Sequence, residues 1–220
     1  MHTGSEIKDI GVFLEGLEVM FSLAKHFPEL EFIDLGSGFK VPYQPGDSEI
    51  DLNALGAKVA EAFAGYEKET GSKLQVWFEP GKYLVSQSGY LLVKANVIKQ
   101  TPATVFVGVN SGFNHLIRPM FYESYHHIIN ITNPEGPERI YTVVGNICET
   151  DTFAWDRKLN EVREGDLLVF LNAGAYGFEM SSNFNSRLKP AEVMVLEGKP
   201  HLIRKRDEFQ DLLRGQIEVL

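Results

Sequence analysis

The sequence is poor in cysteine and in positive charge. Cys148 is the single cysteine of 220 residues, which excludes an internal disulfide framework and a cysteine-built zinc site. Lys and Arg total 21 against 30 Asp and Glu, a formal net charge of −9. Because the longest basic run is Arg204-Lys205-Arg206, we expect neither nucleic acid nor an anionic membrane surface as a partner. A lone thiol is typical of a reducing compartment, so we expect a cytoplasmic protein.

Long apolar runs, repeats and low-complexity tracts are also missing. No stretch approaches the roughly 20 apolar residues that a membrane helix needs, and residues 1–5 lack the charged-then-apolar pattern of a signal peptide. We therefore expect no membrane anchor and no targeting segment. The hydrophobic content of 44% is enough for one large or two small packed cores, so the chain is predicted to be globular and to act on a small molecule.

The first third of the chain has the pattern of strands alternating with helices. Helical spacing of apolar residues covers 10–24 and 52–66, and short buried strands are predicted at 31–35 and 74–79. Such a βαβ unit has parallel strands, and its ligands bind where those strands end. The unit is either a small open sheet or part of a (β/α)8 barrel, which needs about 250 residues. We favour a partial barrel over residues 1–90.

The remainder of the chain is predicted to be mainly strands. After about residue 92 the apolar period shortens toward two, and several short strands at this spacing favour an antiparallel β-barrel or sandwich. The predicted strands are 93–98, 104–109, 126–131, 139–144, 166–171 and 191–204, the last folded at 197–200. Only residues 206–213 are predicted to be helical again. The predicted fold class is therefore α/β followed by an all-β domain over residues 91–220.

Candidate functional residues lie where the predicted strands end. Gly36-Ser37-Gly38 follows the first strand, and glycine loops of this kind either cradle a phosphate or only make a turn. Glu79 follows the second parallel strand, with Lys82 close behind it, so an acid and a base lie beside the same loop. Either the carboxylate serves the site or it is simply solvated.

Three later segments carry further candidates. Arg118, between apolar neighbours, either binds a carboxylate through its fork or covers the core with its stem. Cys148 beside Glu149 is either an acid next to a clamp for a cation or an inert buried thiol. Residues 172–187 are small, polar and aromatic without a core period, and a loop of this composition predicts a function.

Six ordered motifs together resemble the fold-type III pyridoxal-phosphate decarboxylases, the group that acts on diaminopimelate, ornithine and arginine. The motifs are His2-Thr3-Gly4-Ser5, residues 35–39, residues 79–82, residues 116–119, Gly145 with Cys148-Glu149, and residues 174–177. The resemblance covers nearly the whole chain. It implies the C-terminal portion of a (β/α)8 barrel followed by an antiparallel β domain, in a homodimer whose active sites are shared between subunits.

The resemblance implies pyridoxal 5′-phosphate as the cofactor and no metal. His2 corresponds to the catalytic imidazole that stacks on the cofactor ring, and Ser5 to a hydroxyl near its phosphate. The tract Gly36, Ser37, Gly38 corresponds to the phosphate-binding glycines. Glu79 corresponds to the carboxylate that pairs with the pyridine nitrogen, and Tyr176 to the tyrosine beside the cofactor.

The resemblance also implies how a substrate is held. Lys82, Arg118 and Tyr122 correspond to the group that receives the distal carboxylate, with Lys82 standing where the family usually has Arg. Cys148 corresponds to the catalytic acid contributed to the neighbouring subunit's site, and Glu149 to the carboxylate that binds the distal ammonium group.

These roles imply a carboxy-lyase that converts meso-diaminopimelate to L-lysine and carbon dioxide, a step of lysine biosynthesis. The pair Cys148-Glu149 favours this substrate, because relatives acting on simple diamines have aspartate after the cysteine. The alternatives are a decarboxylase of ornithine, arginine or a carboxylated polyamine, and a non-catalytic remnant. The family's lysine that binds the cofactor covalently precedes the motif at His2, so we expect the 220-residue chain to be a fragment that is inactive alone.

Overall fold

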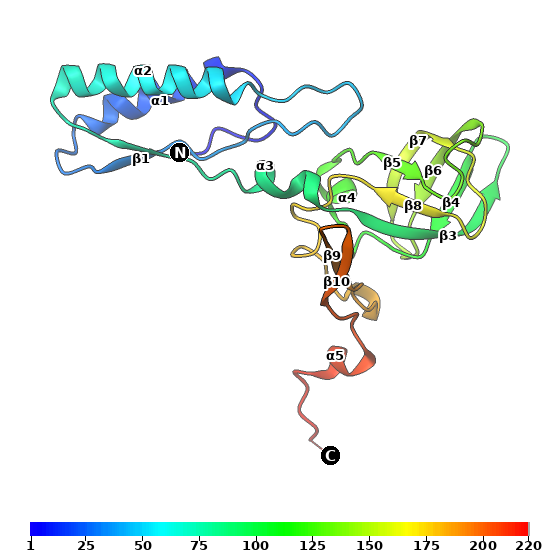
Figure 1. Cartoon of the computed structure of the whole chain (residues 1–220). Coiled ribbons are helices and arrows are strands. Elements are labelled where there is room, and N and C mark those ends of the chain that lie inside the picture. Colours follow the sequence, from blue (N-terminus) through cyan, green and yellow to red (C-terminus); the bar gives the residue numbers. More distant parts are fainter. Residues whose placement is uncertain (220) are drawn as a thin grey trace. The chain divides into compact units, whose positions relative to one another are not determined.

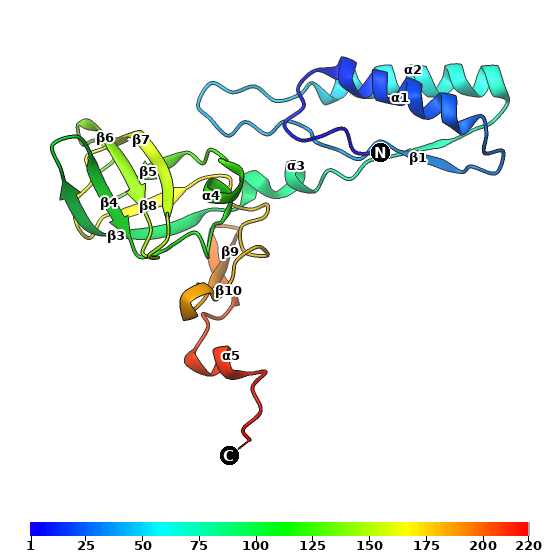
Figure 2. The same cartoon turned by 180° about the vertical axis from the view of Figure 1, so that it is seen from behind.

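The computed structural model describes residues 1–219, which form two compact units. The first unit is Met1–Gly89 and the second begins at Tyr90. Figures 1 and 2 show both units from opposite sides. No helix among the described residues is both long enough and apolar enough to cross a membrane.

The first unit is a βαβ assembly. Its two long helices are α1 (Ile10–Ala24) and α2 (Leu52–Thr70), and its two strands are β1 (Phe32–Asp34) and β2 (Gln75–Trp77). The strands pair in parallel, and in Figure 1 the helices run side by side on one side of them. A short helix, α3 (Gly81–Val85), and a 3-10 turn, η1 (Ser86–Ser88), close the unit.

Local sequence signals set the ends of the two long helices. The side chain of Asp9 accepts a hydrogen bond from Gly11 N, and that of Asp51 accepts one from Ala54 N, so each helix begins at a capping aspartate. Gly71 adopts a left-handed φ of 74° and ends α2. The core between helices and strands includes Phe13, Leu17, Ile33, Leu35, Leu55 and Val59.

The second unit is built on a six-stranded sheet in the order β5-β8-β3-β4-β6-β7. The edge strands β5 and β7 lie against each other, so the sheet nearly closes on itself around an apolar core. The strands are β3 (Leu91–Gln100), β4 (Val105–Val109), β5 (Ile128–Asn130), β6 (Glu138–Val144), β7 (Thr152–Asn160) and β8 (Leu167–Phe170). A hairpin and short helices complete the unit: α4 (Arg118–Tyr122), η2 (Phe184–Ser186), β9 (Glu192–Leu196), β10 (Lys199–Arg204) and α5 (Phe209–Leu213).

Three features of the second unit differ from the sequence-based expectation. Strands β4 and β6 pair in parallel, whereas the other pairs are antiparallel, because the chain crosses the sheet between them. Strand β7 was not predicted, since Asp156, at a left-handed φ of 45°, interrupts its alternation and shifts its register against β6. Residues 118–122 form the short helix α4, which has Pro119 in its first turn and ends at Glu123, whose φ is a left-handed 54°.

Candidate functional site

The first group of candidate residues lies where β1 and β2 end. Both strands run in the same direction, so the loops that follow them meet at one edge. The backbone N–H of Glu79 donates a hydrogen bond of 2.7 Å to the carbonyl of Gly36. The glycine loop and the exposed Glu79 are therefore held next to each other, as the strand pattern predicts.

The glycine loop is covered by the segment that carries His2 and Ser5. Ile7 N donates to the carbonyl of Gly38 at 2.7 Å, and residues 7 and 39 form an isolated parallel bridge. Gly36 and Gly38 have left-handed φ angles of 67° and 97°, and a Cβ at Gly38 would lie 2.2 Å from the carbonyl oxygen of Gly4. Only glycine fits at these two positions, because the backbone of residues 1–4 lies directly on them.

The residues around this loop fit a phosphorylated cofactor. The Gly36 N–H donates a hydrogen bond of 2.7 Å to Asp34 Oδ1, whereas the N–H groups of Ser37 and Gly38 make no hydrogen bond within residues 1–219. The Lys82 ammonium and the Ser5 hydroxyl lie 2.7 Å apart and add a cation and a further donor. Backbone N–H groups, a hydroxyl and a cation are the groups that bind phosphate.

Lys82 is held by two residues, one of which the sequence did not single out. Its ammonium contacts the Ser5 hydroxyl and forms an ion pair with the Glu6 carboxylate, and its side chain is only 12% exposed. Lys40 lies 3.5 Å from the same carboxylate and 3.2 Å from that of Asp47. The signal for Glu6 was its place directly after the motif at residues 2–5.

The second unit brings together Arg118, Tyr122 and Tyr176. Arg118 is 6% exposed, and the carbon at the centre of its guanidinium group lies 6.0 Å from the ring centroid of each tyrosine. Its Nη2 donates to the Ser124 hydroxyl at 3.2 Å. Both tyrosines are exposed, and Tyr176 has a left-handed φ of 56°. A guanidinium group between exposed aromatic rings is suited to bind a carboxylate.

Cys148 and Glu149 form a separate exposed group with Asn185. The thiol of Cys148 donates to Glu149 Oε2 at 3.3 Å. The Asn185 amide lies 3.6 Å from the sulfur and donates to the same carboxylate oxygen at 3.3 Å. Asn185 was predicted only as part of the unusual segment 172–187.

A buried histidine is electrostatically coupled to Arg118. His126 Nδ1 donates to the carbonyl of Leu171 at 2.9 Å, and the side chain is 1% exposed. Desolvation, with a smaller effect from the charges of Arg118 and Arg157, lowers the pKa of His126 to about 4, although the hydrogen bond to Leu171 opposes this effect. The imidazole is therefore neutral at pH 7. Arg157 itself lies over the ring of Tyr125, 3.7 Å from its centroid.

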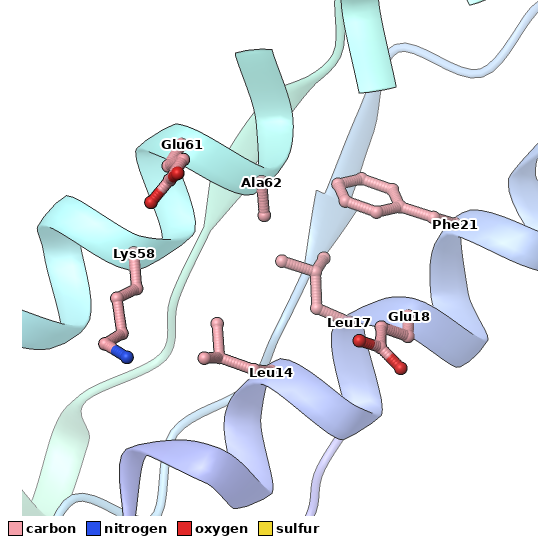
Figure 3. A pocket seen from close by; sticks show the side chains of 7 residues that line it. All are labelled: Leu14, Leu17, Glu18, Phe21, Lys58, Glu61 and Ala62. Carbon is pink, nitrogen blue, oxygen red and sulfur yellow. The ribbon is translucent and has the colours of Figure 1, made fainter. Parts of the chain in front are cut away.

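A pocket of about 260 Å³ lies between α1 and α2 of the first unit. Figure 3 shows its apolar lining between the two helices, with Glu18, Lys58 and Glu61 around it. No candidate residue lines it. Among residues 1–219 there is also no cluster of three or more His, Cys, Asp or Glu side chains that could hold a metal ion.

Comparisons with known proteins match both units to one family. The model for "Pyridoxal-dependent decarboxylase, pyridoxal binding domain" matches residues 1–86, and that for "Pyridoxal-dependent decarboxylase, C-terminal sheet domain" matches residues 82–174.

Curated relatives named diaminopimelate decarboxylase match nearly the whole chain. The one from Methanothermobacter thermautotrophicus is 43% identical over 98% of this chain and 52% of its own length. The one from Archaeoglobus fulgidus is 38% identical over 98% and 52%. The chain therefore spans about half the length of the curated relatives it matches.

Solved structures of diaminopimelate decarboxylases also match nearly the whole chain. Diaminopimelate decarboxylase from Methanocaldococcus jannaschii has a TM-score of 0.90 at 33% identity, covering 99% of this chain and 51% of that one. The Helicobacter pylori enzyme, complexed with L-lysine, has a TM-score of 0.86 at 33% identity, covering 97% and 52%. From these matches and the glycine loop joined to Glu79, we conclude that the chain belongs to the pyridoxal-dependent decarboxylase family.

Proposed function

We propose that this chain serves in the pyridoxal-phosphate-dependent decarboxylation of meso-diaminopimelate to L-lysine and carbon dioxide. The observation that carries the proposal is the hydrogen bond from Glu79 N to the carbonyl of Gly36, which supports a role for Glu79 next to a glycine loop suited to phosphate. The relatives named diaminopimelate decarboxylase and the L-lysine in the Helicobacter pylori structure support the choice of substrate and product.

Residues of the first unit would hold the cofactor. Ser5 and the N–H groups of Ser37 and Gly38 would bind its phosphate, and the His2 imidazole would stack on its ring. The bound cofactor supplies an electron-accepting ring for the bond cleavage. The Glu79 carboxylate would keep the ring nitrogen protonated, which sustains this capacity.

Residues of the second unit would bind the substrate and return the proton. The Arg118 guanidinium, with Tyr122, would receive the distal carboxylate. Lys82 is a further substrate-binding residue of the proposal. Glu149 would bind the distal ammonium group. When carbon dioxide leaves, its bonding electron pair remains with the α-carbon, and the thiol of Cys148 would donate the proton that carbon needs.

The same proposal includes a homodimer in which Cys148 and Glu149 serve the partner subunit's site. It is supported by the exposure of this pair on the surface of the second unit. We propose a cytoplasmic location, which the unpaired, exposed thiol of Cys148 favours.

A chimera tests the proposed function. Residues 1–220 replace the matching half of the Methanothermobacter thermautotrophicus relative, and carbon dioxide release is measured with diaminopimelate, ornithine and arginine. We expect diaminopimelate to be preferred by about 100-fold or more, because a buried guanidinium group left without its carboxylate is costly. The 220-residue chain alone and the relative's half alone serve as controls. Preference for ornithine or arginine would contradict the substrate assignment. A folded chimera that does not bind the cofactor would contradict the whole proposal.

A further inference from the structure

The loop that carries Cys148 and Glu149 is organised around a buried carboxylate. We propose that Asp151 is the positioning residue of the Cys148–Glu149 pair: its carboxylate, bound in a cradle formed at Gly112 and Gly145, fixes the loop that presents both side chains. The inference rests on the proposed function of that pair. It assigns to Asp151 no contact with substrate or cofactor.

The Asp151 carboxylate connects two segments that are far apart in the sequence. Its Oδ1 accepts a hydrogen bond of 2.8 Å from Phe113 N, and its Oδ2 accepts one of 2.9 Å from Ile147 N. Its backbone carbonyl accepts a third, of 2.7 Å, from Gly145 N. The residue is 5% exposed. The loop from Gly145 to Asp151 is therefore closed on itself and fastened to the segment after β4.

Two glycines make room for this carboxylate. A Cβ at Gly145 would lie 2.0 Å from Asp151 Oδ2, and a Cβ at Gly112 would lie 2.7 Å from the same oxygen. Neither glycine has a positive φ. Glycine is therefore required at these positions by the lack of room for a Cβ and not by the backbone conformation. The carboxylate occupies the position where side chains at 112 and 145 would be.

A third segment is attached to the same loop from the other side. Asn185 contacts both Cys148 and Glu149, and Arg187 Nη2 donates to the carbonyl of Asn146 at 3.1 Å. Asn146 N in turn donates to the carbonyl of Ser111 at 3.0 Å. Asp151 thus holds the base of the loop while Asn185 holds its exposed side chains.

The two N–H donors require a carboxylate at this position. Asparagine has one acceptor oxygen, so its amide NH₂ group would face either Phe113 N or Ile147 N, donor against donor. Burial raises the pKa of Asp151, while the hydrogen bonds from the backbone oppose this effect. The two N–H donors therefore offset part of the free-energy cost of burying the Asp151 carboxylate.

The first experiment uses Cys148 as a reporter, since it is the single cysteine of the chain and is exposed. The alkylation rate of the 220-residue protein with iodoacetamide is compared with that of Asp151→Asn at pH 8. We expect the rate to rise by roughly fivefold or more, because a released loop frees the sulfur from its contacts with Glu149 Oε2 and the Asn185 amide.

Asp166→Asn is the matched control. Asp166 is also a buried carboxylate of the second unit, 6% exposed, and it accepts hydrogen bonds of 2.9 Å from Arg163 N and from the Asn130 amide. We expect this variant to lose stability without any change in the alkylation rate. Equal alkylation rates in the two variants would overturn the proposal, because Asp151 would then contribute stability alone.

Gly145→Ala provides a second route if Asp151→Asn fails to fold. Its added Cβ displaces the carboxylate without removing the charge, so the alkylation rate of Cys148 is expected to rise here as well.

In the chimera, both variants should lower kcat by at least about tenfold and leave cofactor affinity unchanged. An unchanged kcat in a variant with altered alkylation would overturn the link to catalysis. If the parent chimera shows no decarboxylation, the proposed function fails separately, and the alkylation result still decides the role of Asp151 in the loop.

Discussion

The Lys82 ammonium lies 2.7 Å from the Ser5 hydroxyl and pairs with the Glu6 carboxylate. This contact joins the segment carrying His2 to the start of α3, across 76 positions of sequence. Since the Lys82 side chain is only 12% exposed, the pair is shielded from solvent more than most surface ion pairs. Under the proposed function, a substrate carboxylate would compete with Glu6 for the Lys82 ammonium.

The first prediction concerns this ion pair. In a double-mutant cycle with Lys82→Met and Glu6→Gln, we expect a coupling energy of about 1 kcal/mol in the free energy of unfolding. The cycle for Lys25 and Glu69, whose side chains are 45% and 64% exposed, should give no more than about 0.3 kcal/mol. Urea titration measures both cycles, and additive effects at Lys82 and Glu6 would contradict the prediction.

The second prediction concerns the glycine loop. Gly38→Ala places a Cβ against the carbonyl of Gly4, so we expect it to cost at least about 2 kcal/mol of stability and to weaken cofactor binding in the chimera. Gly46→Ala is the control, because Gly46 has a similar φ of 84° but open space around it, and it should cost about 1 kcal/mol. Similar losses in the two variants would mean that the covering segment does not restrict the loop.

The third prediction concerns acid stability. His126 has a pKa of about 4 in the folded protein against 6.5 unfolded, so below pH 6.5 the unfolded chain binds a proton that the folded chain does not. Stability is therefore lost as the pH falls from 6.5 toward 4, by about 3 kcal/mol from this residue. His126→Asn keeps a donor for the carbonyl of Leu171 and should flatten this limb of the pH profile, measured by urea unfolding. An unchanged limb would show that other groups control acid unfolding.

The fourth prediction concerns Arg118. In the chimera, Arg118→Lys should raise KM for diaminopimelate by roughly 10- to 100-fold with a smaller effect on kcat, because lysine keeps the charge and loses the fork. Arg139→Lys is a matched control, since the Arg139 guanidinium lies 5.9 Å from the ring centroid of Tyr141 but is 46% exposed. The KM of both variants is measured from carbon dioxide release. Equal KM values for the two variants would contradict a role of Arg118 in substrate binding.

Much of the local structure could be predicted from periodicity and capping residues. The pattern over residues 10–24 matches α1, and Gly71 marks the end of α2. These signals act within a few residues of the chain, so they can be read without a structure. Strand β7 could not be predicted from the sequence because Asp156 interrupts its alternation. The helix α4 could not be predicted either, because five residues are too few to show a helical period.

The sequence by itself determined the family's motifs and the meeting of the Gly36 loop with Glu79, because parallel strands must end at one edge. The tertiary structure decided which side chains hold these groups. Glu6 pairs with Lys82, Asp151 binds Phe113 N from 38 positions away, and Asn185 contacts Cys148 from 37 positions away. Contacts of this kind leave no periodic trace, because they depend on which loops the packed strands bring together.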